Sequence, residues 1–196
     1  MYRKVYQKIG ITGNPGTGKK SVGSSLAKSL GYDFLDLNEL AIEKGSIIDE
    51  DEHGYIADLS LLRKFAKKVI NEKSIVIVGH LLPFVISKRE IELVVVLRCS
   101  PFELEKRYLS RNYSRKKINE NIASEILGIC AYEALNKFGK DRVAEFDTTK
   151  KDVIKVVEEI FKVIKGIAPK RVGFIDWLQL FTEPEQISRF FDLGIL

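Results

Sequence analysis

Short apolar runs alternate with amphipathic segments along most of this chain of 196 residues. Five runs have the length and composition of β-strands, and we predict strands over residues 8–12, 32–37, 74–79, 92–98 and 142–147. The runs at 75–78 and 93–97 are uninterrupted and rich in β-branched residues, which is typical of strands that helices cover on both faces. The pattern therefore predicts an α/β fold with a parallel sheet.

The amphipathic segments predict helices over residues 59–69, 101–109, 118–138 and 152–164. Pro101 suits the first turn of its helix, because a proline there removes no intrahelical hydrogen bond. The last predicted helix ends before Gly166, and a strongly aromatic segment follows it. We therefore predict one α/β domain over residues 1–165 and a C-terminal extension over residues 166–196.

The segment between the first strand and the next helix has the composition of a phosphate-binding loop. It runs from Gly13 to Ser21 as Gly-Asn-Pro-Gly-Thr-Gly-Lys-Lys-Ser. Glycines at this spacing let backbone N–H groups surround nucleotide phosphates, and the first lysine reaches the terminal phosphates. The alternative is an ordinary strand-to-helix turn that uses its glycines only for backbone freedom. We predict that ATP or ADP binds at Gly13, Gly16, Gly18, Lys19, Lys20 and Ser21.

One position of this loop departs from the usual pattern. A serine or threonine normally follows the lysine and holds Mg²⁺ through its hydroxyl. Here Lys20 occupies that place and Ser21 comes one residue later. Ser21 is therefore our candidate Mg²⁺ ligand, and the loop supports nucleotide binding better than it supports catalysis.

Composition and charge limit the class of protein. With 45% hydrophobic residues the chain can bury a substantial single core. The net charge of +5 suits an anionic partner such as a nucleotide or RNA, and basic residues are concentrated at 107–117. The apolar runs are too short to cross a bilayer and the N-terminal residues do not resemble a signal peptide, so we expect a cytoplasmic protein without a membrane partner.

Three segments after the loop carry a resemblance to a known family. They are Leu-Asp-Leu-Asn-Glu-Leu-Ala at 35–41, Val-Gly-His at 78–80, and the stretch from 97 to 125. Together with the loop they resemble the adenylate kinase isoenzyme 6 family over about residues 7–165. The resemblance implies a three-layer P-loop fold with a five-stranded parallel sheet in the order 2-3-1-4-5. It also implies ATP or ADP with Mg²⁺, transfer from ATP to AMP or ATP hydrolysis, and a role in small-ribosomal-subunit assembly and rRNA processing beside a ribosomal protein.

The resemblance also implies roles for particular residues. Residues 110–120 would form a short lid over the triphosphate, with Arg111 closing on the phosphoryl group. His80 would act in ATP hydrolysis, although a histidine that only caps its strand is the alternative. Lys150 would lie near the adenine or its ribose, unless it is an ordinary surface lysine. The implied catalytic residues are Lys19, His80 and Arg111.

The lobe that receives the monophosphate would span residues 36–57, with the acidic run at 49–53 as a mobile, solvated loop. Members of the family commonly carry an arginine after the Leu-Ala pair, where this chain has Ile42. Isoleucine cannot bind a phosphate group, so a grip on AMP would need another cation. The candidates are Lys44, Arg63 and Arg89.

Three departures from the family pattern weaken phosphoryl transfer more than nucleotide binding. They are Lys20, Ile42 and the missing acidic residue beside His80; Asp36 is a possible outer-shell carboxylate for the metal. Two alternatives to an adenylate kinase therefore stay open: a catalytically silent nucleotide-binding assembly chaperone, and a kinase for a small acceptor other than AMP.

The C-terminal extension contains an unusual density of aromatic residues. An exposed set of this size would favour aggregation, so the extension either folds back over its own domain or docks on a partner. The residues concerned are Phe174, Trp177, Phe181, Phe190 and Phe191.

Overall fold

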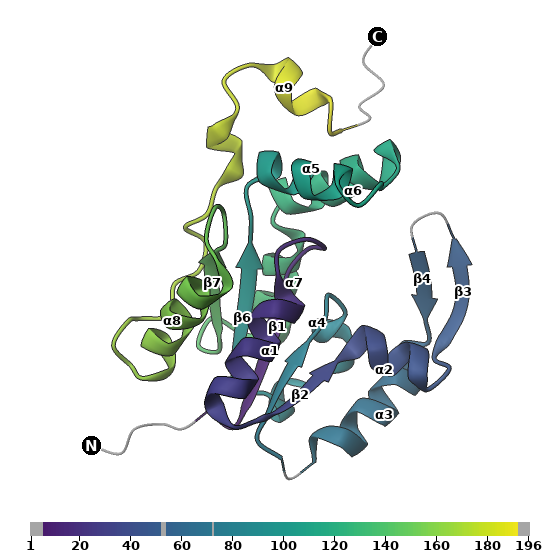
Figure 1. Cartoon of the computed structure of the whole chain (residues 1–196), viewed down its shortest axis with the longest axis vertical. Coiled ribbons are helices and arrows are strands. Elements are labelled where there is room, and N and C mark those ends of the chain that lie inside the picture. Colours follow the sequence, from purple (N-terminus) through teal and green to yellow (C-terminus); the bar gives the residue numbers. More distant parts are fainter. Residues whose placement is uncertain (1–5, 52–53, 72, 192–196) are drawn as a thin grey trace.

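The computed structural model describes residues 6–51, 54–71 and 73–191. Its centre is a five-stranded sheet in which every pair of neighbouring strands is parallel (Figure 1). Counted among the five predicted strands, the order is 2-3-1-4-5, so the predicted topology is confirmed. Across the sheet the strands are β2 (Asp33–Asp36), β5 (Ile75–Val78), β1 (Lys8–Thr12), β6 (Leu93–Arg98) and β7 (Val143–Asp147).

Helices cover both faces of the sheet, as the uninterrupted apolar strands predict. On one face, α1 (Lys19–Leu30) and α8 (Val153–Ile164) pack in a shared apolar cluster. On the other face, α3 (Leu59–Ile70), α4 (Leu82–Val85) and α7 (Ile129–Phe138) pack in a second cluster. The fold therefore has three layers with a core on each side of the sheet.

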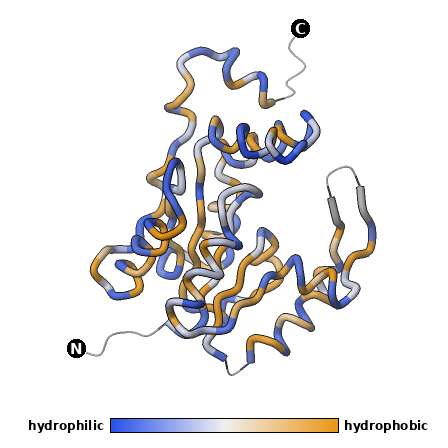
Figure 2. Tube along the Cα trace, viewed as in Figure 1, coloured by the Kyte–Doolittle hydropathy of each residue, from blue (hydrophilic) through white to orange (hydrophobic). Residues whose placement is uncertain are grey.

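Strand β6 shows how one run of residues supplies both cores. Val94 and Val96 belong to one cluster, whereas Leu93, Val95 and Leu97 belong to the other. All five are fully buried, and each buried aliphatic side chain of this size contributes about 1.5–3 kcal/mol. Figure 2 shows this concentration of hydrophobic residues along the central strands.

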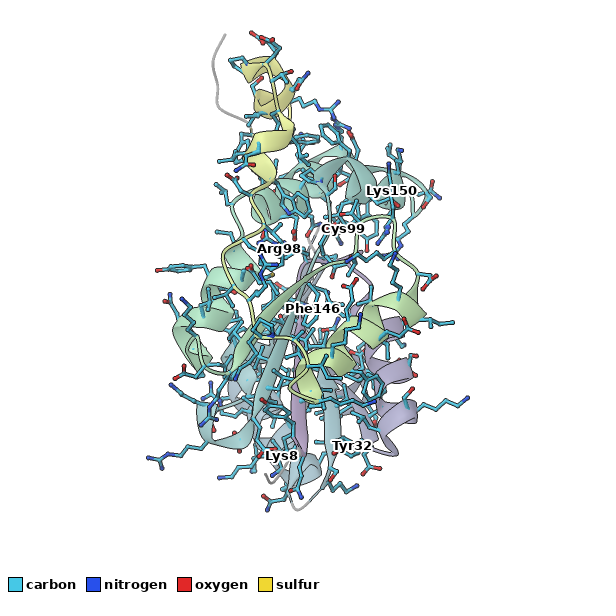
Figure 3. All side chains as sticks on the ribbon, turned by 90° about the vertical axis from the view of Figure 1, so that its left-hand side faces the viewer. Lys8, Tyr32, Arg98, Cys99, Phe146 and Lys150 are labelled. Carbon is cyan, nitrogen blue, oxygen red and sulfur yellow. The ribbon has the colours of Figure 1, made fainter. Side chains whose placement is uncertain are left out.

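Parallel strands bring their carboxyl ends to one edge of the sheet, which is where open α/β sheets bind ligands. Figure 3 places Arg98, Cys99 and Lys150 toward this edge, whereas Lys8 and Tyr32 lie at the opposite end. The predicted phosphate loop leaves the central strand β1 at the same edge.

The predicted helix over 118–138 is wrong as a single element. The structure has α6 (Arg115–Ile126) and then α7, separated at Gly128. Gly128 has a φ of 67°, a left-handed conformation that ends one helix and redirects the chain before the next. The other three predicted helices correspond to α3, α5 (Pro101–Leu109) and α8.

The lobe after β2 also differs from the prediction. After α2 (Leu37–Glu43) the chain forms an antiparallel hairpin of β3 (Ile47–Asp51) and β4 (Gly54–Ala57). Residues 49–51 of the predicted acidic loop are therefore part of a strand, whereas 52 and 53 lie outside the described residues. Cross-strand pairing overrides the weak strand preference of the acidic residues here.

The C-terminal extension crosses the molecule beside β7 and then lies over α5 and α6 (Figure 1). It contains the short elements η2 (Trp177–Leu180) and α9 (Pro184–Ser188). Trp177 and Phe190 are 7% and 2% exposed, so these aromatic residues fold back onto the domain. Phe174 stays exposed at its surface.

Candidate active site

The phosphate loop is shaped by glycines that no other residue could replace without strain. Gly13 has a φ of 140°, and a Cβ atom there would lie 2.3 Å from the carbonyl oxygen of Leu97. Gly18 has a φ of 95° and precedes the first residue of α1. The loop can therefore turn sharply from β1 into the helix.

Side chains from distant elements hold the loop through its carbonyl groups. Tyr108 Oη donates to the oxygen of Pro15 at 2.6 Å, and Arg107 Nη1 donates to the oxygen of Gly16 at 2.9 Å. Thr148 Oγ1 donates to the main-chain oxygen of residue 17 at 3.2 Å. Because the carbonyls bond to the surrounding protein, the loop is fixed before any ligand binds.

The loop's amide groups show the complementary pattern. Within the described part of the chain, the amide nitrogens of Gly16, Gly18 and Lys19 donate no hydrogen bond. The first N–H groups of a helix have no intrahelical acceptor and, with the helix dipole, attract anions. These amides are therefore available to phosphate oxygens.

A cavity of about 240 Å³ opens against this loop. It brings together most of the predicted nucleotide-binding residues with residues from β2, β5 and the turn after α5. Gly13 is buried behind the loop and does not line the cavity. The lining residues are Gly16, Gly18, Lys19, Lys20, Ser21, Asp36, Asn38, Val78, Gly79 and Arg111.

Lys19 supplies the main positive charge of the loop. Its Nζ donates to the main-chain oxygen of Asn14 at 2.9 Å. Burial, followed by the positive charge of Arg111, lowers the pKa of Lys19 to about 8, although nearby carboxylates oppose the shift. An ammonium group that is short of negative partners favours an anion in the cavity.

Arg111 lines the same cavity. It lies in the turn between α5 and α6, where its N–H bonds to the carbonyl of Tyr108 at 3.1 Å. Its side chain is exposed, so it has room to move onto a ligand. The predicted lid at 110–120 is this turn together with the first part of α6.

Lys20 and Ser21 differ in how they face the cavity. The ammonium group of Lys20 forms a hydrogen-bonded ion pair with Glu39 of α2. This pair raises the pKa of Lys20 and directs its charge toward Glu39. Ser21 is exposed and lines the cavity with Asp36, the residue that ends β2. Asp36 also caps α2 by accepting from the N–H of Asn38 at 2.9 Å.

His80 lies close to the cavity but does not line it. It follows β5 directly; the residue as a whole is exposed, whereas its ring lies against neighbouring protein atoms. Loss of water around the ring, followed by the charge of Lys19, lowers the pKa of His80 to about 4. The imidazole is therefore neutral at physiological pH.

Lys150 lies in the loop after β7 and is exposed. It has a φ of 53°, an uncommon conformation for a lysine. It does not line the cavity, although Thr148, two residues earlier, bonds to the phosphate loop.

The alternative cations for an acceptor phosphate do not line this cavity. Lys44 pairs with Glu43, and Arg63 Nη2 donates to the oxygen of Phe84 at 2.5 Å beside a different cavity. Arg89 belongs to the short helix η1 (Lys88–Glu90), which is absent from the lining. None of the three therefore replaces the arginine that Ile42 displaces.

Comparison with known proteins decides the family. The profile of a family described as an AAA domain matches residues 9–128. Proteins from Pyrococcus abyssi and Methanocaldococcus jannaschii, both named "Putative adenylate kinase", are each 35% identical to this chain over 175 and 180 residues. The alignments cover 89% and 90% of this chain and 93% and 96% of those proteins. The chain belongs to this adenylate kinase-like family.

Solved structures agree on the fold of this adenylate kinase-like protein. Shikimate kinase from Acinetobacter baumannii in complex with shikimate matches with a TM-score of 0.61 and 18% identity, over 86% of this chain and 97% of that one. A gluconokinase from Sinorhizobium meliloti 1021 matches with a TM-score of 0.56 and 17% identity, over 82% and 93%. The protein is thus a P-loop kinase, and the family implies binding of ATP or ADP.

No helix among the described residues of this adenylate kinase-like protein is long and apolar enough to span a bilayer.

Sequence reasoning missed the residues that brace the loop. Arg107 and Tyr108 lie in the stretch that carries the family resemblance, and Thr148 follows the last strand, but local sequence does not show that these side chains reach the loop. Asn38 was missed too, although it follows a parallel strand at the edge where ligands bind. The place of Asn38 two residues after a strand end is the signal that could have identified it from the sequence.

Proposed function

We propose that this protein transfers the γ-phosphoryl group of ATP to AMP, with slow ATP hydrolysis as a side reaction. One observation carries the proposal: Lys19 and Arg111 line the same cavity, at the end of a phosphate loop with unbonded amides. A phosphoryl group in transfer spreads negative charge over its oxygens, and two cations fixed around it stabilise that charge.

The loop and the two cations have separate tasks. The amides of Gly16, Gly18 and Lys19 bind the phosphate chain and hold it in line with the helix dipole of α1. The ammonium of Lys19 neutralises the terminal phosphates. Arg111, on an exposed turn, closes over the transferring group and displaces water.

The oxygen donors in the cavity fit a Mg²⁺ ion. Mg²⁺ prefers hard oxygen ligands, and the Ser21 hydroxyl and the Asp36 carboxylate both line the cavity. Lys20 does not take this place, because its charge is directed to Glu39. When bound, Mg²⁺ would neutralise charge on the phosphates. Ser21 and Asp36 would hold it, directly or through water.

His80 has the properties of a group that orients a water molecule. A neutral imidazole with a pKa of about 4 is a poor base but a good hydrogen-bond partner. We assign it the slow hydrolytic reaction. We assign Lys150 to the base or ribose of ATP, because Thr148, two residues earlier, bonds to the phosphate loop.

The acceptor side supports only weak activity with AMP. Asp36, Asn38, Val78 and Gly79 line this side, and Ile42 is 57% exposed on α2. None of the described residues that line this side is a cation that could bind a monophosphate, so the proposal predicts a high KM for AMP.

Steady-state ADP formation from ATP and Mg²⁺ tests the proposal, with and without AMP. The proposal predicts turnover that rises with AMP and is lost in Lys19→Ala. AMP-independent turnover that Lys19→Ala removes would leave an ATPase. Turnover that appears only in Lys20→Thr would indicate a silent nucleotide-binding protein. A panel of small hydroxylated acceptors in place of AMP tests the remaining alternative.

We also propose a role in small-ribosomal-subunit assembly, which rests on the resemblance of residues 97–125 and on the net charge of +5. Cosedimentation of the purified chain with small ribosomal subunits, with and without ATP, tests it. Absence from the subunit fraction under both conditions would contradict it.

A further inference from the structure

A fully buried carboxylate outside the cavity connects the C-terminal extension to the phosphate loop. Glu125 of α6 has an exposed fraction of 0%. Its Oε1 accepts from Arg98 Nε at 2.6 Å and from Trp177 Nε1 at 2.8 Å. Its Oε2 accepts from Asn14 Nδ2 at 2.7 Å. A buried carboxylate is costly unless such bonds satisfy it, so these donors hold its position firmly.

The extension donates hydrogen bonds to a buried charge cluster. Arg98 lies between Glu125 and Glu145, with Nη1 3.5 Å from the second carboxylate. One positive charge therefore faces two negative ones. The extension gives one N–H group to each carboxylate: Trp177 bonds to Glu125, and the amide of Gly173 bonds to Glu145 at 2.8 Å.

Asn14 carries this arrangement into the phosphate loop. Its Oδ1 accepts from Ser124 Oγ at 2.9 Å and from Cys130 Sγ at 3.4 Å. Burial raises the pKa of Cys130 to about 12, so the thiol keeps its proton and remains a donor. The main-chain oxygen of the same asparagine accepts from Lys19 Nζ at 2.9 Å. Asn14 therefore bonds Glu125 through its side chain and the phosphate-binding lysine through its backbone.

A second contact runs from the extension to the same loop. Phe190 is 2% exposed and packs in an apolar cluster with Tyr108 and Ile118, from α5 and α6. The hydroxyl of Tyr108 bonds to the loop at Pro15. The two helices that Phe190 joins are those whose connecting turn carries Arg111.

We propose that Trp177 is a positioning residue for ATP binding: its indole N–H fixes Glu125, which fixes Asn14 and the loop conformation that presents Lys19. The inference rests on the proposed function for the identity of the ligand. An extension that only covered apolar surface would not affect the nucleotide site. This inference gives the extension a role in positioning that site.

Isothermal titration with ATP, at a temperature where circular dichroism shows every variant folded, tests this inference. Trp177→Phe keeps an aromatic side chain at this buried position but removes the indole N–H group together with one ring. Because the loop conformation that presents Lys19 is proposed to depend on this bond to a charged group, ATP affinity should fall about tenfold or more. Leu178→Ala is the matched control, since it changes the next residue of η2, which is exposed, and should leave affinity unchanged.

The wild-type chain gives an independent readout, because Trp177 is its single tryptophan. Saturating ATP should change the tryptophan emission of the wild type. Unchanged emission in a chain that binds ATP, or unchanged ATP affinity in Trp177→Phe, would overturn the inference alone. A wild-type chain that binds no ATP would overturn the proposed function as well.

Discussion

The two walls of the nucleotide cavity are built in different ways. The phosphate-loop wall is braced from outside by Arg107, Tyr108 and Thr148, and it directs unbonded amides and Lys19 inward. The opposite wall holds Asp36 and uncharged residues, while the position expected for an arginine is an exposed isoleucine. The loop wall already holds its donors and its cation in place for a triphosphate, whereas the described residues of the other wall include no cation for an acceptor phosphate.

This difference indicates which part of the activity the chain specifies most strongly. When hydrogen-bond donors are already in place, ligand binding does not have to order them, so the free-energy cost of binding is small. We expect ATP binding to depend sharply on single residues of the loop wall. Acceptor binding should instead change little when a side chain of the opposite wall is removed, and more when a cationic side chain is added there.

The largest expected effect is that of removing the loop lysine. Lys19→Ala should lower kcat/KM for ATP by about 10³-fold, because the charge acts at a desolvated site where each such group contributes strongly. Lys20→Ala is the matched control: this neighbouring lysine is ion-paired with Glu39, and its removal should change kcat/KM by less than about threefold. Equal losses of kcat/KM in Lys19→Ala and Lys20→Ala would contradict the special role of Lys19 in the loop wall.

Arg111 should affect the rate more than binding. Arg111→Ala is expected to lower kcat by about 10²-fold or more with little change in KM for ATP, because the guanidinium acts mainly on charge that develops in transfer. Arg115→Ala serves as control, since Arg115 is exposed and pairs with Glu105 at 2.8 Å. A rise in KM at constant kcat would assign Arg111 to ground-state binding instead.

The pH dependence of ATP affinity sharpens the role of the loop wall. Lys19 has a pKa lowered to about 8, so its ammonium form predominates below that pH and is lost above it. ATP binding requires the charged form, and affinity should therefore fall as pH rises through about 8, by at most about tenfold per pH unit. Titration calorimetry from pH 7 to 10 measures this. The Lys20→Ala variant should keep the same profile, and a flat wild-type profile would contradict the assignment.

The smallest effect is expected on the acceptor wall. Ile42→Arg adds a guanidinium at the exposed position on α2 and should lower KM for AMP by about tenfold, the effect of one charge-assisted hydrogen bond. The control Ile42→Gln adds a polar group without charge and should change KM little. Equal effects of both variants would show that charge at this position is not what AMP binding lacks.

Local patterns were sufficient to predict the sheet and the phosphate loop. The positions of the five strands and the glycine spacing of the loop depend on residues that are near one another in sequence or share an apolar period, whereas the strand order was implied by the family resemblance. The helix break at Gly128 was missed because apolar residues continue past it on both sides. The β3–β4 hairpin was missed because acidic residues rarely favour a strand, and cross-strand pairing decides their conformation.

The bracing of the site could not be predicted for a different reason. Asn14 and Glu125 are 111 positions apart, and Trp177 is a further 52 from Glu125. No periodic pattern links residues at such separations, and Asn14 stands at a position of the loop motif that any residue can occupy. Their association becomes visible only when the fold is known.

Phosphorus NMR of the wild-type chain with ATP, AMP and Mg²⁺ tests the central claim most directly, because it identifies every product at once. The account predicts that AMP is consumed and that two ADP molecules form for each AMP lost, with only a minor release of inorganic phosphate, and that Lys19→Ala stops the reaction. Loss of ATP to ADP and inorganic phosphate, with AMP left unchanged, would contradict it.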